Sequence, residues 1–147
     1  MLISKIDLQR FEKQIILKNI GINGQKKLKN ARVLIIGAGG LGCPLIMYLA
    51  SCGVGTIGIV DNDKVEVSNL NRQTLFSIKD INKFKASQAK KKINKINNQI
   101  KVTIYKERLD FKNASNIIKK YGIVCDGTDN FKTRYLINDT CLKLKKN

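Results

Sequence analysis

The stretch "ARVLIIGAGGLGCPLIMYLASCGVGTIGIVD", residues 31–61, sets the architecture of this chain. It opens with the apolar run "ARVLIIG" (31–37), which is typical of a strand buried in a parallel sheet. "LGCPLIMYLASCG" (41–53) follows as an apolar helix that Gly53 ends, and "TIGIVD" (56–61) is a second strand. Strand, helix and strand together form one βαβ unit of the usual length, about 30 residues.

The same alternation continues downstream and predicts one α/β domain over residues 1–147. Right-handed crossovers favour a Rossmann-like, doubly wound, mainly parallel sheet with strand order 3-2-1-4. Upstream, apolar residues at helical spacing predict an N-terminal helical extension that packs on the domain; they are Leu8, Phe11, Ile15 and Ile16. The remaining helices are expected at 83–98, 114–121 and 130–144, and the remaining strands at 101–105 and 123–126.

Composition excludes several kinds of partner. The net charge is +17, but the lysines are scattered and no basic stretch alternates with aromatic residues, so we expect no nucleic-acid binding. Residues 33–60 carry no charge, yet glycines and a proline divide them into strand, helix and strand, so we expect no membrane span. The absence of histidine and the wide cysteine spacing argue against a zinc site and for reduced thiols, in the cytoplasm or an equivalent reducing compartment such as an organelle stroma; the cysteines are Cys43, Cys52, Cys125 and Cys141.

The loop "GAGGLG" (37–42) matches G-x-G-x-x-G between a strand and a helix. Gly37 permits the tight turn, Gly39 lets a phosphate approach the backbone, and Gly42 allows the helix to pack closely on the strand. The helix N-terminus adds unpaired N–H groups and partial positive charge. The motif, which includes Gly40, predicts nucleotide binding without naming the nucleotide.

Polar residues follow the second strand. Asp61 is expected to hydrogen-bond ribose hydroxyls, with a turn-starting aspartate as the alternative. Asp63 stays open between a site residue and a turn residue. Arg72 has no acidic neighbour at helical spacing and could fork onto phosphate oxygens, with Asn69 and Gln73 as neutral donors; a solvated arginine is the alternative.

Lys85 differs from most lysines of its helix. At about 100° per residue it falls inside the apolar stripe. It also lies in the first turn, where the helix dipole disfavours cations. An inward lysine there indicates an anion, and we expect a phosphate contact; its neighbours on the stripe are Ala89, Ile93, Ile96 and Ile100.

Asp129, in "DGTDN" (126–130), is either the N-cap of the last helix or a site residue. Order 3-2-1-4 makes strands one and four neighbours, and ligands bind in the crevice between their carboxyl ends. A carboxylate that faces phosphates needs a cation, and Mg²⁺ suits oxygen ligands. Arg72, Lys85 and Asp129 therefore favour ATP with Mg²⁺ over NAD, although lysine or tyrosine could replace a dehydrogenase histidine.

Several segments together resemble the ThiF/MoeB/HesA adenylyltransferases, relatives of the ubiquitin-activating enzymes. They lie in the family's order over essentially the whole chain. The resemblance implies ATP–Mg²⁺-dependent adenylation of the C-terminal carboxylate of a small ubiquitin-like sulfur-carrier protein, as in molybdopterin or thiamine biosynthesis. The segments are "RFEKQIIL" (10–17), "GAGGLG", "DNDKVEVSNLNRQTLF" (61–76), Lys85 and "CDGTDNFKTRYLINDTC" (125–141).

The resemblance also implies residue roles. Asp61 would bind the ribose, and Asp129 would hold Mg²⁺. The carboxylate would attack the α-phosphate and pyrophosphate would leave, with no general base, because a carboxylate is already ionised at neutral pH. Catalysis would then rest on positioning and charge neutralisation. The residues implied to contact phosphates are Asn69, Arg72, Gln73 and Lys85.

Two departures from the family pattern matter. At the position of Lys13 the family usually has an arginine that reaches the partner's ATP across a dimer interface; lysine keeps the charge but not the bidentate fork. Family domains also continue well beyond this length, so we expect a C-terminally truncated domain whose fourth strand is an open apolar edge. A homodimer, or a complex with a chain that supplies the missing half, is expected.

Two other functions stay open. The first is a non-catalytic, degenerate ThiF-like nucleotide-binding or dimerisation module, favoured by the short chain. The second is a fragment of a NAD-dependent oxidoreductase, because the glycine motif by itself does not separate NAD from ATP.

Overall fold

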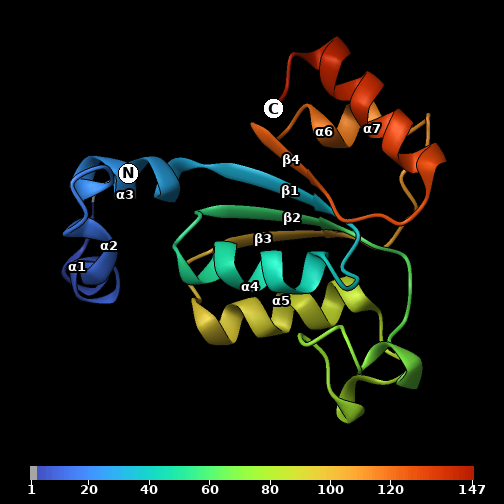
Figure 1. Cartoon of the computed structure of the whole chain (residues 1–147), viewed down its shortest axis with the longest axis horizontal. Helices are drawn as coiled ribbons and strands as arrows, with labels where there is room; N and C mark the ends of the chain where they lie inside the picture. The colour runs from blue at the N-terminus through green and yellow to red at the C-terminus, as the bar shows by residue number, and fades with distance from the viewer. Residues whose placement is uncertain (1–2) are drawn as a thin grey trace.

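The computed structural model describes residues 3–147 and shows a four-stranded parallel sheet between two layers of helices (Figure 1). Helices α4 (Gly42–Ser51) and α5 (Lys85–Ile96) cover one face, and α6 (Ala114–Ile118) and α7 (Phe131–Leu144) cover the other. The strand order β3-β2-β1-β4 confirms the predicted α/β class and topology. The strands are β1 (Arg32–Ile36), β2 (Thr56–Val60), β3 (Lys101–Tyr105) and β4 (Ile123–Asp126).

Strand β1 lies at the centre of the sheet, and its composition explains why. Val33 and Ile35 pack into the core under α4 and α5, whereas Leu34 and Ile36 pack into the core under α6 and α7. All four are at most 2% exposed. A strand covered on both faces needs an unbroken apolar run rather than an alternating one, which is the pattern that the sequence shows.

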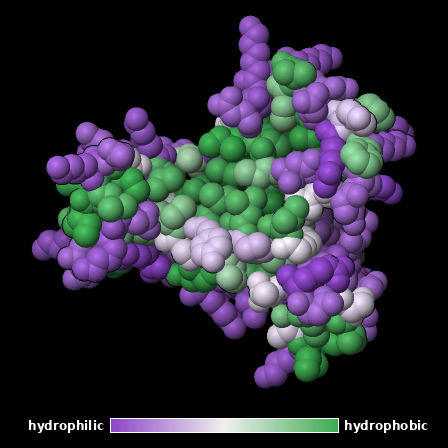
Figure 2. All heavy atoms as spheres, viewed as in Figure 1, coloured by the Kyte–Doolittle hydropathy of each residue, from purple (hydrophilic) through white to green (hydrophobic). Residues whose placement is uncertain are grey.

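Strand β4 forms one edge of the sheet. It pairs with β1, and at its other side the Val124 N–H donates to the carbonyl oxygen of Asn147, 2.7 Å away. Ile123 is 43% exposed. On the face seen in Figure 2, apolar atoms gather in the middle of the molecule, between the N-terminal helices and the pair α6 and α7. The edge is therefore apolar, as predicted, and apart from the bond to Asn147 no strand of the described chain pairs with it.

The N-terminal extension consists of three helices at the amino ends of the strands: α1 (Lys5–Arg10), α2 (Glu12–Ile15) and α3 (Gly21–Asn30) (Figure 1). Phe11 is 3% exposed and anchors the group. The predicted packing through Leu8 and Ile16 is wrong, because they are 42% and 66% exposed. The helix is interrupted at Phe11, between α1 and α2, so the four apolar residues form no continuous stripe.

A buried ion pair holds α1 instead. The Asp7 carboxylate, 2% exposed, accepts from Lys29 on α3 at 2.5 Å and from the Ser4 N–H and hydroxyl. Burial opposes ionisation of Asp7, but these donors outweigh it and lower its pKa. Across residues 3–147, no helix is both long and apolar enough to span a lipid bilayer.

Candidate functional site

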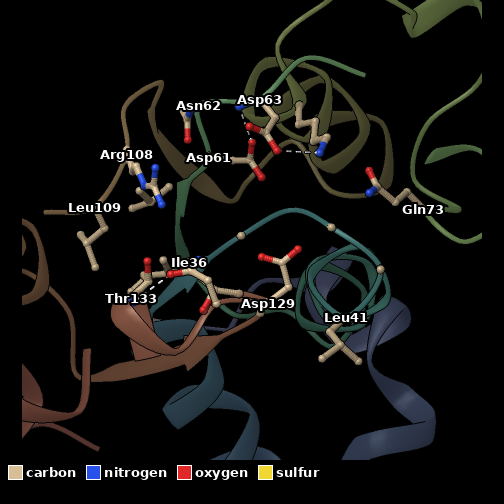
Figure 3. Close-up of a pocket in the computed structure, with 18 of the residues that line it drawn as sticks. Ile36, Leu41, Asp61, Asn62, Asp63, Gln73, Arg108, Leu109, Asp129 and Thr133 are labelled. Atoms are coloured by element: carbon tan, nitrogen blue, oxygen red, sulfur yellow. Dashed lines mark hydrogen bonds and ion pairs between the residues drawn. The ribbon is translucent and has the colours of Figure 1, made fainter. Parts of the chain in front are cut away.

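A cleft of about 740 Å³ lies at the carboxyl ends of the strands, where the loops after β1, β2, β3 and β4 converge (Figure 3). It brings together almost all the predicted site residues. Arg72 and Asp129, far apart in sequence, both line it with the glycine loop. Gly42 and Lys13 do not line it. The predicted residues in its wall are Gly37, Gly39, Gly40, Asp61, Asp63, Asn69, Arg72, Gln73, Lys85 and Asp129.

The glycine loop is compact because two of its positions admit no side chain. Gly37 has φ +90°, and a Cβ on it would lie 2.8 Å from the Gly127 carbonyl oxygen. A Cβ on Gly42 would lie 1.9 Å from the Gly37 carbonyl oxygen but 3.8 Å from the strand side chain Ile35. Gly42 thus lets the start of helix α4 approach the backbone at the end of β1, in agreement with its predicted role in close helix–strand packing.

The other side of the loop faces the cleft. A Cβ would have ordinary contacts at Gly39 and Gly40, with nearest atoms at 3.8 and 3.7 Å. Within the described chain, the backbone N–H groups of Gly39, Gly40 and Leu41 have no hydrogen-bond partner. Unpaired N–H groups at the start of a helix are a binding site for an anion such as phosphate.

Asp61 joins the glycine loop to the end of β2. It is 9% exposed, and its two carboxylate oxygens accept from the Ala38 N–H at 2.7 Å and the Asp63 N–H at 2.8 Å. Burial raises the pKa of Asp61, partly offset by these two donors and by nearby Lys85. Each carboxylate oxygen can accept a further hydrogen bond, so a hydroxyl donor in the cleft, such as a ribose hydroxyl, suits this group.

Lys85 begins helix α5 and points inward, as its place on the apolar stripe predicted. The residue is 6% exposed, and its Nζ lies 3.0 Å from Oδ2 of Asp63, whose side chain is 61% exposed. The anion beside Lys85 in this structure is therefore Asp63. Because Lys85 also lines the cleft, a phosphate there could share or replace this partner.

The long connection between β2 and α5 carries the neutral donors and Arg72. Asn69, 7% exposed, uses its Oδ1 to accept from the Glu66 N–H. Gln73 is 3% exposed, and its Oε1 has no partner among residues 3–147. Its Nε2 is the atom that a side chain at Gly39 would meet first. Figure 3 shows its amide pointing toward the glycine loop. A buried amide without a partner costs free energy unless a ligand pairs with it.

Arg72 lies on the exposed side of this connection. Its aliphatic part covers Gly40, and its Nη1 donates to the Ser68 carbonyl oxygen at 2.9 Å and to Asn71 Oδ1 at 3.1 Å. No carboxylate pairs with it in the described part of the chain. Its remaining N–H groups are free to bind an anion over the glycine loop.

Asp129 lies in the loop between β4 and α7. The N-cap of α7 is Asn130, whose Oδ1 accepts from the Thr133 N–H at 3.0 Å, so the alternative of Asp129 as an N-cap is wrong. Among residues 3–147 the Asp129 carboxylate has neither a hydrogen bond nor an ion pair. Figure 3 shows it pointing into the cleft toward the glycine loop.

Sequence reasoning missed several residues of the wall. Glu107, Arg108 and Leu109 follow β3, and Arg134 lies on α7. The place of 107–109 at the carboxyl end of a strand was the available signal. With them, five acidic and five basic side chains line the cleft, so the charge of +17 lies mainly elsewhere. The acidic set is Asp61, Asp63, Glu66, Glu107 and Asp129, and the basic set is Lys64, Arg72, Lys85, Arg108 and Arg134.

Two other predicted features lie outside the cleft. Lys13, on α2, has an 84% exposed side chain 3.4 Å from Glu12 and does not line the cleft. The four cysteines are free, and burial raises the pKa of Cys43 to about 11. Within the described range, no group of three or more histidine, cysteine, aspartate or glutamate side chains is placed to hold a metal.

Known proteins share both sequence and fold with this chain. The ThiF family pattern matches residues 11–147. The probable adenylyltransferase/sulfurtransferase MoeZ of Mycobacterium tuberculosis is 49% identical over 140 residues, 95% of this chain and 36% of MoeZ. The sulfur carrier protein adenylyltransferase of Thermus thermophilus is 45% identical over 97% of this chain and 53% of its own.

The structural neighbours agree. Escherichia coli TcdA, a tRNA N6-threonylcarbamoyladenosine dehydratase solved in complex with ATP, has a TM-score of 0.93 at 26% identity, over 99% of this chain and 60% of TcdA. E. coli MccB, solved with MccA-N7isoASN, has a TM-score of 0.86 at 30% identity, over 97% of this chain and 42% of MccB. This chain spans between about a third and three fifths of these proteins. From the matched sequence pattern and the shared fold, we conclude that the chain belongs to the ThiF family.

Proposed function

We propose that this chain carries the ATP-binding part of an enzyme that adenylates the C-terminal carboxylate of a ubiquitin-like sulfur-carrier protein. One observation carries the proposal: the Asp129 carboxylate points across one cleft toward the glycine loop, and neither it nor the N–H groups of Gly39, Gly40 and Leu41 have a partner among residues 3–147. A phosphate chain between them satisfies both sides, provided a cation lies next to Asp129. Two of the similar proteins are named as adenylyltransferases, and the TcdA structure contains ATP.

The residues fit Mg²⁺ with a nucleotide. Magnesium is usually held by one or two carboxylates together with phosphate and water oxygens, and Asp129 offers one carboxylate that no other group occupies. Bound there, Mg²⁺ would neutralise phosphate charge. The charge of the cleft explains why a cation is needed. The acidic side chains in the wall cancel the basic ones, and ATP then adds its own negative charge.

The chain's own groups then have distinct roles. Asp61 binds the ribose, and the glycine loop and the Asn69 and Gln73 amides hold the phosphates. Arg72 and Lys85 stabilise negative charge at the phosphates as it moves. The carrier carboxylate attacks the α-phosphorus, the bond to the β-phosphate breaks, and pyrophosphate leaves with the electron pair. No proton moves, which suits a site without histidine.

We also propose partners for the surfaces that the cleft does not use. Lys13 is exposed and does not line its own cleft, so a homodimer in which it reaches the ATP of a second copy fits. The β4 edge and the apolar residues Tyr48 and Ile123, both at least 43% exposed, fit a chain that supplies the part of the relatives not matched here. Four free thiols fit a reducing compartment such as the cytoplasm.

Calorimetric titration with ATP, with Mg²⁺ and with EDTA, tests the proposal. We expect ATP to bind, and Asp129→Asn to lose the Mg²⁺-dependent part of the affinity. Asp139→Asn, an exposed change on α7, is the matched control and should behave as wild type. Failure of the wild-type chain to bind ATP, or equal losses in both variants, would contradict the proposal.

Exchange of labelled pyrophosphate into ATP, with a sulfur-carrier protein present, separates two functions. Exchange supports an adenylating enzyme. ATP binding without exchange, even when the unmatched part of a relative is added, favours the non-catalytic module instead; the chain's coverage of only 36% of MoeZ gives that alternative its weight.

A further inference from the structure

The loop "DGTDN" is restrained at every residue except Asp129. Asp126 Oδ1 accepts from the Thr128 N–H at 2.8 Å and from the Thr128 hydroxyl at 2.6 Å. Gly127 donates to the Ile36 carbonyl oxygen and packs against the glycine loop. Asn130 caps helix α7. A loop built in this way presents one free carboxylate at a fixed place.

Arg134 supplies the remaining restraint. It lies in the first turn of α7, and two of its N–H groups, on Nε and Nη2, donate to the single carbonyl oxygen of Thr128 at 3.2 and 2.8 Å. The guanidinium also lies over the Phe131 ring, 5.7 Å from the centroid. This carbonyl oxygen belongs to the peptide bond between Thr128 and Asp129. A shift of Arg134 would therefore move the backbone that carries the Asp129 side chain.

We propose that Arg134 is a positioning residue for Asp129: its forked hydrogen bond to Thr128 holds the carboxylate where a nucleotide-bound Mg²⁺ needs it. The inference rests on the proposed function for the identity of the ligand, but the clamp itself is a property of the chain alone. Arg134 acts through the backbone and not by touching phosphate. In metal sites, such supporting groups typically change metal affinity by about 10- to 100-fold.

Two measurements test the clamp. The first is hydrogen exchange of the Thr128 backbone amide, which donates to Asp126 Oδ1, without nucleotide, in wild type, Arg134→Gln and Arg134→Lys. We expect faster exchange in Arg134→Gln and an intermediate rate in Arg134→Lys, because lysine keeps the charge but has no planar fork. Unchanged exchange in Arg134→Gln would overturn the clamp, whether or not the chain binds ATP.

The second measurement is the ratio of the ATP Kd with EDTA to the Kd with Mg²⁺, by calorimetry. Arg134→Gln should lower this ratio about tenfold or more and leave the Kd with EDTA and the urea midpoint unchanged. Lys132→Gln removes a cation from the same turn, where its exposed side chain makes no hydrogen bond within residues 3–147, and should keep the wild-type ratio.

The outcomes separate the possible failures. An equal loss with EDTA would mean that Arg134 contacts phosphate directly, and an equal loss in Lys132→Gln would mean that only charge matters; either overturns the positioning role. Wild-type ATP binding with a normal ratio in Arg134→Gln overturns this inference and leaves the proposed function standing. No ATP binding by wild type overturns both, because the ligand assumed for the carboxylate is then wrong.

Discussion

The floor of the cleft is formed mainly by backbone atoms, whereas its rim is formed by side chains. The floor, defined as the glycine loop 37–42 with Asp61 and Gly127, consists of backbone packed on backbone and one buried carboxylate. The rim, defined as Asp63, Asn69, Arg72, Gln73 and Lys85, consists of side chains on the connection between β2 and α5 and on the first residue of α5. The floor therefore belongs to the fold and the rim to the ligand, and damage to each should be visible in a different measurement.

The largest effect is expected in the floor. Gly42→Ala places a Cβ 1.9 Å from the Gly37 carbonyl oxygen, and since backbone cannot move aside cheaply, it should lower the free energy of unfolding by about 3 kcal/mol. Gly40→Ala, whose Cβ would lie 3.7 Å from the nearest atoms, is the control and should change it by less than about 0.5 kcal/mol. Urea unfolding measures both, and similar values for the two would show that the close approach of Gly42 to Gly37 does not set the cost.

Arg72→Ala should weaken ATP binding and leave the stability of the fold unchanged. It removes charge-assisted hydrogen bonds to phosphate worth about 1.5–3 kcal/mol, so the ATP Kd should rise about tenfold to a hundredfold while the urea midpoint stays the same. Arg72→Lys should fall between, because it keeps charge without the fork. Calorimetry and urea unfolding on the same preparations check this. An Arg72→Ala chain that is less stable yet binds ATP normally would place Arg72 in the fold.

Asp63→Asn tests whether Lys85 serves the fold or the ligand. It removes the partner of buried Lys85, and because the Asp63 side chain is 61% exposed, the expected loss of stability is only about 1 kcal/mol. Phosphate should then replace the lost carboxylate, so ATP should raise the thermal midpoint of the variant more than that of wild type. Equal shifts would mean that Lys85 belongs to the fold alone; Asp139→Asn serves as the control.

The smallest effect concerns the pH dependence contributed by Asp61. Burial raises its pKa above the ordinary value of 3.8, so the folded chain binds this proton more tightly than the unfolded chain. The stability that Asp61 contributes is then fully present below pH 3.8 and declines as pH rises through the folded pKa. The difference in unfolding free energy between wild type and Asp61→Asn should therefore fall over this window. Urea unfolding at several pH values measures it, and a rising difference would contradict the assignment.

The sheet was predictable because its signals are local and redundant. The expected strands at 101–105 and 123–126 match β3 and β4 to the residue, since each is a short run rich in β-branched and aromatic residues. The strand order followed from crossover handedness. Helix α3 (Gly21–Asn30) was not predicted, because its two glycines and three lysines leave only Ile22 and Leu28 to mark a stripe. It is stabilised by tertiary contacts such as buried Gln25, whose Nε2 donates to the Cys52 carbonyl oxygen.

The site residues also divide into those that carry a local sequence signal and those that do not. Asp61, Arg72, Lys85 and Asp129 were found because each breaks a local expectation or follows a strand. Arg134 was missed, since its role depends on a carbonyl oxygen six residues earlier that only the folded loop brings within reach. The choice between Asp129 and Asn130 as the N-cap was equally beyond sequence, because both side chains cap helices well.

The backbone contact between Gly37 and Gly127 also limits how this protein could be redesigned. A Cβ on Gly37 would lie 2.8 Å from the Gly127 carbonyl oxygen and a Cβ on Gly127 would lie 3.0 Å from the Gly37 carbonyl oxygen, so both positions should stay glycine. A mutant library aimed at a different nucleotide would waste its diversity there. Positions 72 and 108, whose side chains are exposed, offer freedom at little risk to folding, and altered ligand preference should emerge from them first.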